Sequence, residues 1–204
     1  MSARADFLKA LSVVGLVVAT AAAGAAPATV SLKSGDWLAP RPAVPPFRLI
    51  DDGGHPFTRT QLTGRWSLLF FGYTHCSSLC PATLATLAGF ERREAGRGRS
   101  GPRVVFVSAD PARDSPTEVK AFVRQFSPDF VGLTADDPAT IDAFARSLDT
   151  AVIVHREQAG NYAVDHTGAI FVVDPRGSLA AVLTGKLTAA TLQQDFDRIQ
   201  AARP

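Results

Sequence analysis

The sequence predicts one α/β domain with a central mixed sheet and helices on both faces. Two almost continuous apolar runs, residues 66–73 and 103–109, have the composition of strands that are buried on both faces of a sheet. Segments with helical spacing separate these runs from later strands, and a turn at 174–177 joins the last two strands as a hairpin. Helices that separate buried strands are typical of layered α/β folds.

The remaining elements follow from local signals. Apolar residues three positions apart predict a helix over 81–93. A capping box that opens at Ser115, with proline at the first helical position, predicts a second helix through about Phe126. Further signals predict a hairpin-like turn at 51–54, a helix over 137–148, strands at 151–154, 169–173 and 179–183, and a closing helix from Thr188.

The chain divides into three predicted parts. Residues 1–30 are an export signal or membrane anchor, 31–46 a stiff proline-rich linker, and 47–204 the domain. No charged residue occurs from Ala10 to Val30, and the small residues in this run satisfy a signal-cleavage pattern. The run is also just long enough to span a bilayer, which takes roughly 20 residues, so both readings stay open. Either one places the rest of the chain outside the cytoplasm.

The charge and composition narrow the class of protein. The chain has 21 Lys and Arg against 19 Asp and Glu, a net charge of +2, whereas a general nucleic-acid binder carries a strong basic excess. Apolar residues make up 46% of the chain and charged residues 20%, which is a globular composition. We therefore expect a folded protein that does not bind nucleic acid.

The two cysteines, Cys76 and Cys80, directly follow a predicted buried strand and precede Pro81, where a helix is expected to begin. Ligands of open α/β sheets bind at this edge, and the amino end of a helix stabilises thiolates. A structural disulfide is the ordinary role of a lone pair in an oxidising compartment, but here it closes a very short loop and adds little stability. We interpret the pair as reactive thiols, which suit Cu(I) or zinc.

Two sulfurs form an incomplete metal site, so the four histidines are candidates for a third ligand. His75 adjoins a cysteine, but neighbouring residues of an extended chain point in opposite directions. His55 in a turn and His155 at a strand end are interpreted as surface residues. His166 lies 86 residues after Cys80, directly before a predicted hairpin strand. Spacing alone does not bring it to the cysteines; only the fold can.

Three segments resemble, in the same order, the signatures of the Sco/SenC family. They are Phe71-Gly72-Tyr73-Thr74-His75-Cys76-Ser77-Ser78-Leu79-Cys80-Pro81, Val107-Ser108-Ala109-Asp110-Pro111-Ala112-Arg113-Asp114-Ser115-Pro116, and Val164-Asp165-His166 with Phe171-Val172-Val173-Asp174-Pro175-Arg176-Gly177. The resemblance runs from about residue 46 to the last helix. One departure is that the family usually has Pro and Asp between its cysteines, where this chain has two serines.

The resemblance implies a thioredoxin-like fold with an inserted or appended hairpin, and copper, as Cu(I) or Cu(II), held by Cys76, Cys80 and His166. It implies a metallochaperone that delivers copper to, or reduces the thiols of, the dinuclear copper site of cytochrome c oxidase subunit II. Another copper enzyme, other copper carriers and thiol reductants are further expected partners. The expected location is the periplasmic side, with the N-terminal segment as the only membrane contact or with that segment removed.

Two other functions stay open at this point. A metal-independent thiol–disulfide oxidoreductase or weak peroxidase uses the same two cysteines and does not need His166. A receptor or sensor domain has Cys76 and Cys80 as a structural disulfide that resists mild reductants. The substitution His166→Ala separates the first of these from a copper protein, because only copper binding depends on the imidazole.

Overall fold

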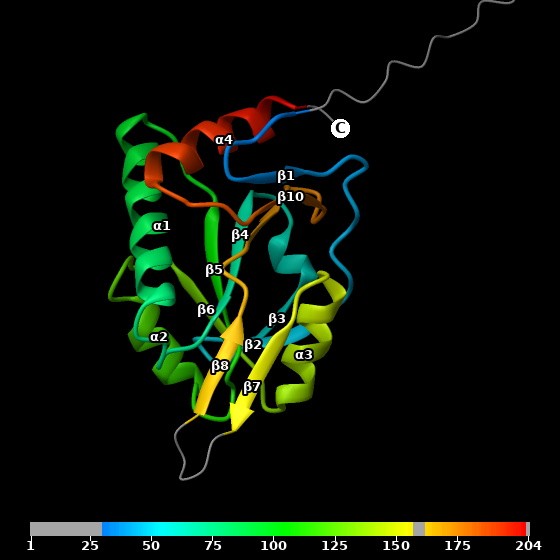
Figure 1. Ribbon diagram of the computed structural model, residues 1–204, viewed down its shortest axis with the longest axis vertical. Helices are drawn as coiled ribbons and strands as arrows, with labels where there is room; N and C mark the ends of the chain where they lie inside the picture. Colours follow the sequence, from blue (N-terminus) through cyan, green and yellow to red (C-terminus); the bar gives the residue numbers. More distant parts are fainter. Residues whose placement is uncertain (1–29, 157–161, 203–204) are drawn as a thin grey trace, which may run out of the picture.

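The computed structural model describes residues 30–156 and 162–202, and its centre is an eight-stranded sheet (Figure 1). The strands follow the order β1-β10-β9-β4-β5-β6-β2-β3, with β4, β5 and β6 parallel and the other neighbours antiparallel. The predicted mixed sheet is therefore confirmed. Its strands are β1 (Gly35–Trp37), β2 (Arg48–Asp51), β3 (Pro56–Thr58), β4 (Ser67–Gly72), β5 (Arg103–Ser108), β6 (Val131–Thr134), β9 (Ile170–Val173) and β10 (Leu179–Leu183).

Helices pack on both faces of this sheet, as predicted. One face is covered by α1, α2 and α4, and the other by α3 together with the short 3-10 helix η1. A core of buried apolar side chains lies between the sheet and the helices on each face. The sheet is therefore apolar on both sides, which explains the continuous apolar runs in β4 and β5. The helices are η1 (Arg59–Leu62), α1 (Leu79–Gly96), α2 (Pro116–Val123), α3 (Pro138–Ser147) and α4 (Ala189–Ala201).

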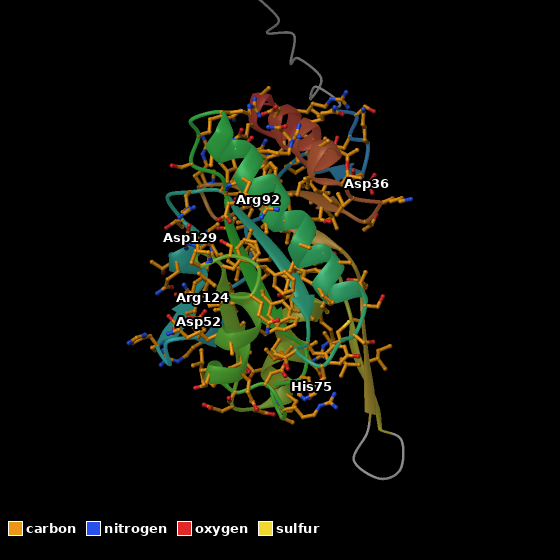
Figure 2. All side chains as sticks on the ribbon, turned by 90° about the vertical axis from the view of Figure 1, so that its left-hand side faces the viewer. Asp36, Asp52, His75, Arg92, Arg124 and Asp129 are labelled. Carbon is orange, nitrogen blue, oxygen red and sulfur yellow. The ribbon has the colours of Figure 1, made fainter. Side chains whose placement is uncertain are left out.

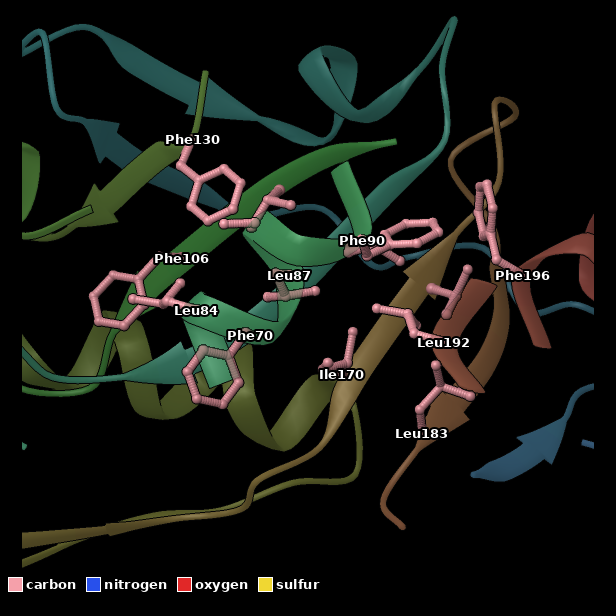
Figure 3. Packing of buried hydrophobic residues seen from close by; sticks show 14 of the residues in the cluster. Phe70, Leu84, Leu87, Phe90, Phe106, Phe130, Ile170, Leu183, Leu192 and Phe196 are labelled. Atoms are coloured by element: carbon pink, nitrogen blue, oxygen red, sulfur yellow. The ribbon is translucent and has the colours of Figure 1, made fainter. Parts of the chain in front are cut away.

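The period-two alternation of β4 divides its side chains between the two cores. Leu68 and Phe70 belong to the core under α1 and α4, whereas Leu69 and Phe71 belong to the core under α3. Figure 3 shows the first of these cores, in which side chains from the sheet, α1 and α4 pack together. β4 is thus anchored from both sides, and its carboxyl end holds the cysteine loop in a fixed place.

Residues 31–46 differ from the predicted linker. They contribute β1, which pairs with β10 at the edge of the sheet. The buried carboxylate of Asp195 in α4 accepts the backbone N–H groups of Lys33 and Ser34, at 2.8 and 2.9 Å. Prolines stiffen this segment, but a carboxylate that satisfies its backbone donors, together with the strand pairing, packs it onto the domain.

A second, two-stranded sheet is formed by β7 (Val152–Arg156) and β8 (Tyr162–His166) (Figure 1). It is an inserted hairpin of the kind that the resemblance implies. The sequence predicted a strand at 151–154 but not β8, because the five residues of β8 neither alternate between polar and apolar nor form a continuous apolar run. The hairpin has no ladder with the eight-stranded sheet among the described residues.

β6 is another strand without a predicted counterpart. Gly132 interrupts its apolar pattern, and a β-carbon at this position would lie 2.2 Å from Val119 Cγ1 in α2. The glycine is therefore needed for α2 to pack closely against the sheet. Glycine has a low strand propensity, so the sequence pattern does not indicate a strand here. The residue is present because α2 packs closely on β6.

Within residues 30–156 and 162–202, no helix is both long enough and apolar enough to cross a membrane. The uncharged run that predicts a signal or anchor lies outside this part of the chain except for Val30. Its role stays a prediction.

Candidate metal centre

The two cysteines lie where β4 gives way to α1. Cys76 is in the connecting loop and is partly exposed, whereas Cys80 is buried in the first turn of the helix; both are free thiols. The helix begins two residues before the predicted start at Pro81, so Cys80 is helical and not part of a loop. The structure confirms that both sulfurs lie at the carboxyl edge of the sheet and the amino end of a helix.

Cys76 has the environment of a thiolate. The backbone N–H of Cys80 points at its sulfur, with an N–Sγ distance of 3.4 Å. Burial raises the pKa of the Cys76 thiol, but N–H donors from Cys80, Ser78 and Leu79 and the Cys80 side chain outweigh burial and lower the pKa. The amino end of α1 therefore acts as a cradle for a negatively charged sulfur.

Cys80 has the opposite character. It is fully buried, and that burial raises the pKa of its thiol far above the ordinary value. The neighbouring Cys76 raises it further, because a thiol that donates to a thiolate keeps its proton. The pair thus combines an accessible thiolate with a buried thiol, and Cys80 becomes a strong ligand only when a cation replaces its proton.

We predict that iodoacetamide labels Cys76 at pH values below the ordinary thiol range and leaves Cys80 unlabelled in the folded protein. The rate should rise with pH as Cys76 loses its proton, with a midpoint below the reference pKa of 9.0. Mass spectrometry of protein labelled across the pH range measures this midpoint. In Cys80→Ala, which lacks one donor, the midpoint should move upward; a wild-type midpoint at or above 9.0 contradicts the prediction.

A buried carboxylate in the loop between β5 and α2 fixes the cysteine loop. Asp114 is fully buried and accepts hydrogen bonds from the Thr74 backbone N–H at 3.0 Å and the Thr74 hydroxyl at 2.6 Å. It also accepts from the Ser108 hydroxyl, at 2.6 Å, at the end of β5. The loop that begins after β4 is therefore fastened to β5 two residues before Cys76.

Two contacts bring the hairpin strand β8 to the same loop. The Tyr73 hydroxyl is hydrogen-bonded to the backbone of Val164, which is buried. On the other side, a β-carbon at Gly168 would lie 3.6 Å from Leu79 Cδ2, so the side chain of Leu79 lies beside this exposed glycine. His166 lies between these two contacts at the end of β8. The fold thus brings its backbone to the cysteine loop across the 86 residues that separate it from Cys80.

The role of His166 as a ligand stays a prediction, because its side chain is outside the described part of the structure. Among the side chains that are described, no three His, Cys, Asp or Glu residues are grouped closely enough to hold a metal ion. The described candidate ligands are therefore the two sulfurs of Cys76 and Cys80. The backbone position of β8 fits the third ligand that the resemblance implies.

We predict that Tyr73→Phe weakens copper binding without removing a ligand. Loss of the hydrogen bond to Val164 loosens β8, and one hydrogen bond of about 1–1.5 kcal/mol corresponds to roughly tenfold in affinity. Competition with a Cu(I) chelator measures the affinity. In a His166→Ala background the same substitution should have little further effect, since the strand then carries no ligand. An equal loss in both backgrounds contradicts a positioning role for Tyr73.

Two of the other histidines have described side chains. The His55 side chain is 78% exposed and lies 3.4 Å from Asp51 Oδ1, in the predicted surface turn. The His75 side chain is 54% exposed, with its Nδ1 3.0 Å from the Thr74 hydroxyl and 3.7 Å from Asp114 Oδ1. His75 therefore contacts the support of the loop and not the sulfurs. The side chain of His155 lies outside the described part of the chain.

Sequence reasoning did not identify Tyr73 and Asp114 as residues that position the site. Both lie inside segments that carry the family resemblance. Their position in these motifs was the one sign in the sequence that could have identified them. Their roles depend on contacts with Val164 and Thr74 that bridge separate elements. Such contacts are a property of the fold and not of local spacing.

Comparison with known proteins decides the family. The SCO1/SenC family profile matches residues 37–201. The chain belongs to the SCO1/SenC family. A putative copper-binding protein of Stutzerimonas stutzeri is 32% identical over 157 residues, which is 77% of this chain and 76% of that protein. The mitochondrial Protein SCO1 homolog 1 of Arabidopsis thaliana is 37% identical over 132 residues, but these are 64% of this chain and only 39% of the relative.

Solved SCO1/SenC structures share the fold. Arabidopsis thaliana ScoI with copper bound superposes with a TM-score of 0.72 at 30% identity and covers 78% of this chain and 99% of that structure. Apo Sco1 of Thermus thermophilus gives a TM-score of 0.70 at 30% identity, with 85% and 98% covered. The thioredoxin-like fold is therefore confirmed. Arabidopsis thaliana ScoI and Bradyrhizobium japonicum ScoI were both solved with copper bound.

Proposed function

We propose that this chain binds copper through Cys76, Cys80 and His166 and delivers it to the dinuclear copper site of cytochrome c oxidase subunit II. The observation that carries the proposal is the cysteine pair at the amino end of α1, with β8 held beside it. Relatives that share this fold have been solved with copper bound.

The donor set suits copper in both oxidation states. Two sulfurs favour Cu(I), and an imidazole beside them extends the site to Cu(II). The Cys76 thiolate, which is partly exposed, is the first sulfur to meet an incoming ion. Cys80 releases its proton as it binds, so uptake should release protons and weaken as the pH falls.

The unequal burial of the two sulfurs also favours release to an acceptor. An acceptor thiolate reaches copper from the side of Cys76, because Cys80 lies beneath the loop with no exposed surface. Exchange of one ligand at a time then moves the ion without leaving it free in solution. The ion is the cargo of this reaction and not a resident cofactor.

A second candidate, reduction of a disulfide of the acceptor to its two thiols, is favoured by the same asymmetry. The Cys76 thiolate attacks one sulfur of a target disulfide, forms a mixed disulfide and releases one target thiolate. Cys80 then loses its proton to solvent and attacks Cys76, which releases the second target thiolate and leaves a Cys76–Cys80 disulfide. Two electrons pass to the target, and an external thiol reductant restores the pair.

We further propose that the protein works on the periplasmic side of a membrane. The uncharged run from Ala10 to Val30 supports export, as a retained anchor or as a cleaved signal. A retained anchor keeps the domain close to a membrane-bound acceptor.

Transfer to a purified soluble copper domain of subunit II tests these proposals. Copper-loaded full chain is mixed with the reduced acceptor, and metal-free reduced chain is mixed with the oxidised acceptor. Copper content and free thiols are measured on the separated partners. Delivery predicts copper on the acceptor in the first reaction; failure of the loaded chain to transfer copper overturns it.

His166→Ala distinguishes the two activities. It should abolish copper delivery and leave thiol reduction nearly unchanged, whereas Cys76→Ala should abolish both. His55→Ala, at an exposed histidine in a distant turn, is the matched control and should change neither. If His166→Ala retained full copper delivery, the three-ligand site would be wrong.

A further inference from the structure

Arginines are concentrated toward one end of the domain. Residues 59–103 contain seven arginines and two acidic residues, whereas residues 104–155 contain four basic and eight acidic residues. The first group surrounds the carboxyl end of α1 and the starts of β4 and β5. Figure 2 shows Arg92 in the upper part of the molecule, where Asp36 also lies, and His75 near the lower end. The overall net charge of +2 hides this polarity.

We define the arginine-rich end by the arginines that gather around the carboxyl end of α1, the turn after β9 and helix α4. Contacts between these elements place the arginines together. Arg97 and Arg99 both form ion pairs with Asp197 of α4. The backbone N–H of Gly64, next to Arg65, donates a hydrogen bond to the carbonyl of Pro175, which precedes Arg176. The members are Arg65, Arg92, Arg97, Arg99, Arg103, Arg176 and Arg198.

The positive charge at this end is only partly neutralised. Arg97 and Arg99 each form ion pairs with Glu94 and Asp197. In contrast, Arg65, Arg92 and Arg176 are exposed and form no ion pair within residues 30–156 and 162–202. These three guanidinium groups are therefore available to an anionic surface.

Two of the arginines also crowd one another. Burial lowers the pKa of Arg103, and the charge of Arg65 lowers it further. Like charges that repel in the free protein are relieved when an anion comes between or beside them. This repulsion adds to the positive charge that the exposed arginines place at this end.

The predicted membrane segment joins the domain at this same end. The guanidinium of Arg198 donates to the carbonyl of Ser31 at 2.9 Å, directly after the uncharged run that ends at Val30. Asp195, on the same helix, holds Lys33 and Ser34. The cysteine loop lies at the opposite edge of the sheet, at the carboxyl end of β4 (Figure 1).

We propose that the arginine-rich end rests on an anionic phospholipid surface and thereby holds the cysteine loop away from the bilayer, toward a partner. The proposal rests on the membrane anchoring proposed above, and it is independent of copper. Guanidinium groups bind phosphate bidentately, and exposed cations next to a membrane anchor are attracted to anionic headgroups. The acidic residues that follow β5 favour the opposite end pointing into solution.

The two tryptophans report this orientation without added labels. Trp37 lies in β1 and Trp66 directly precedes β4, so both lie near the arginine-rich end. The chain has no other tryptophan. Full chain is reconstituted in nanodiscs of phosphatidylcholine alone or with phosphatidylglycerol. Each lipid set includes a headgroup spin label, which quenches tryptophan fluorescence at the surface.

Quenching should increase at least about twofold when phosphatidylglycerol is present and should return to the neutral-lipid value in about 0.5 M sodium chloride, where the Debye length is roughly 4 Å. The triple substitution Arg65→Gln, Arg92→Gln and Arg176→Gln should remove the increase. Arg48→Gln, Lys120→Gln and Arg146→Gln, which remove the same charge from exposed positions elsewhere, should keep it.

Equal quenching in the two lipid sets overturns the proposal, as does an equal loss of the increase in both triple variants. Copper content is measured on the same samples. A protein that binds copper but shows no lipid effect refutes only the membrane face, and a lipid effect without copper binding refutes only the metal site.

Discussion

Replacement of Asp114 by alanine is expected to destabilise the domain by about 4 kcal/mol and to lower copper affinity at least tenfold. The buried carboxylate accepts from Ser108 and from the hydroxyl and backbone N–H of Thr74, so its loss leaves three donors without an acceptor. Each orphaned donor in a buried site costs about 1–3 kcal/mol. Partners of this kind around a metal site are typically worth 10–100-fold in metal affinity.

Urea unfolding and competition with a Cu(I) chelator measure the two effects of Asp114→Ala. Asp129→Ala removes a carboxylate at an exposed position and is the matched control, expected to change stability by less than about 0.5 kcal/mol. Asp114→Asn keeps the shape and one acceptor and should give an intermediate loss. A folded Asp114→Ala protein with unchanged copper affinity would show that Thr74 does not position the cysteine loop.

Gly72→Ala is expected to cost about 3 kcal/mol and to displace Cys80. A β-carbon at this position would lie 2.6 Å from Phe106 Cε2 and 2.7 Å from Cys80 Sγ. Both groups are fully buried, so neither moves without disturbing the core, and overpacking of this kind costs about 1–3 kcal/mol or more. The last residue of β4 is a glycine because the sulfur of Cys80 occupies the space of a side chain.

Two measurements check Gly72→Ala: the midpoint of urea unfolding, and the labelling of Cys80, which should become detectable as its burial is lost. Gly96→Ala is the control, because a β-carbon there meets no atom within 4 Å and lies in the last turn of α1. That substitution should be neutral or slightly stabilising. Wild-type stability for Gly72→Ala would contradict the close packing of the sulfur on β4.

Local pattern predicted most of the fold and the two cysteines of the three-residue candidate site. The apolar runs of β4 and β5, the capping box at Ser115 and the hairpin before α4 have physical causes that lie within a few residues, and the structure confirms each of them. Cys76 and Cys80 are likewise close in sequence, and their place at the end of a buried strand indicated reactive thiols.

What local pattern did not predict depends on distant contacts. β1 became part of the sheet because Asp195 satisfies the backbone of residues 33 and 34. β6 contains Gly132 because α2 packs closely on it. The approach of β8 to the cysteine loop rests on Tyr73 and Val164, two residues whose spacing carries no signal. Only the family resemblance pointed to His166, since no periodicity links it to the cysteines.

Copper stoichiometry of the reduced full chain, measured beside Cys76→Ala, Cys80→Ala and His166→Ala, tests the central claim most directly. Two sulfurs and one imidazole in a single site predict one copper per chain, with tight binding lost in each of the three variants and retained in His55→Ala. Unchanged stoichiometry and affinity in His166→Ala would contradict the three-ligand site. Absence of copper in the reduced wild-type chain, together with a readily reducible Cys76–Cys80 disulfide, would leave thiol–disulfide exchange as the function of the pair.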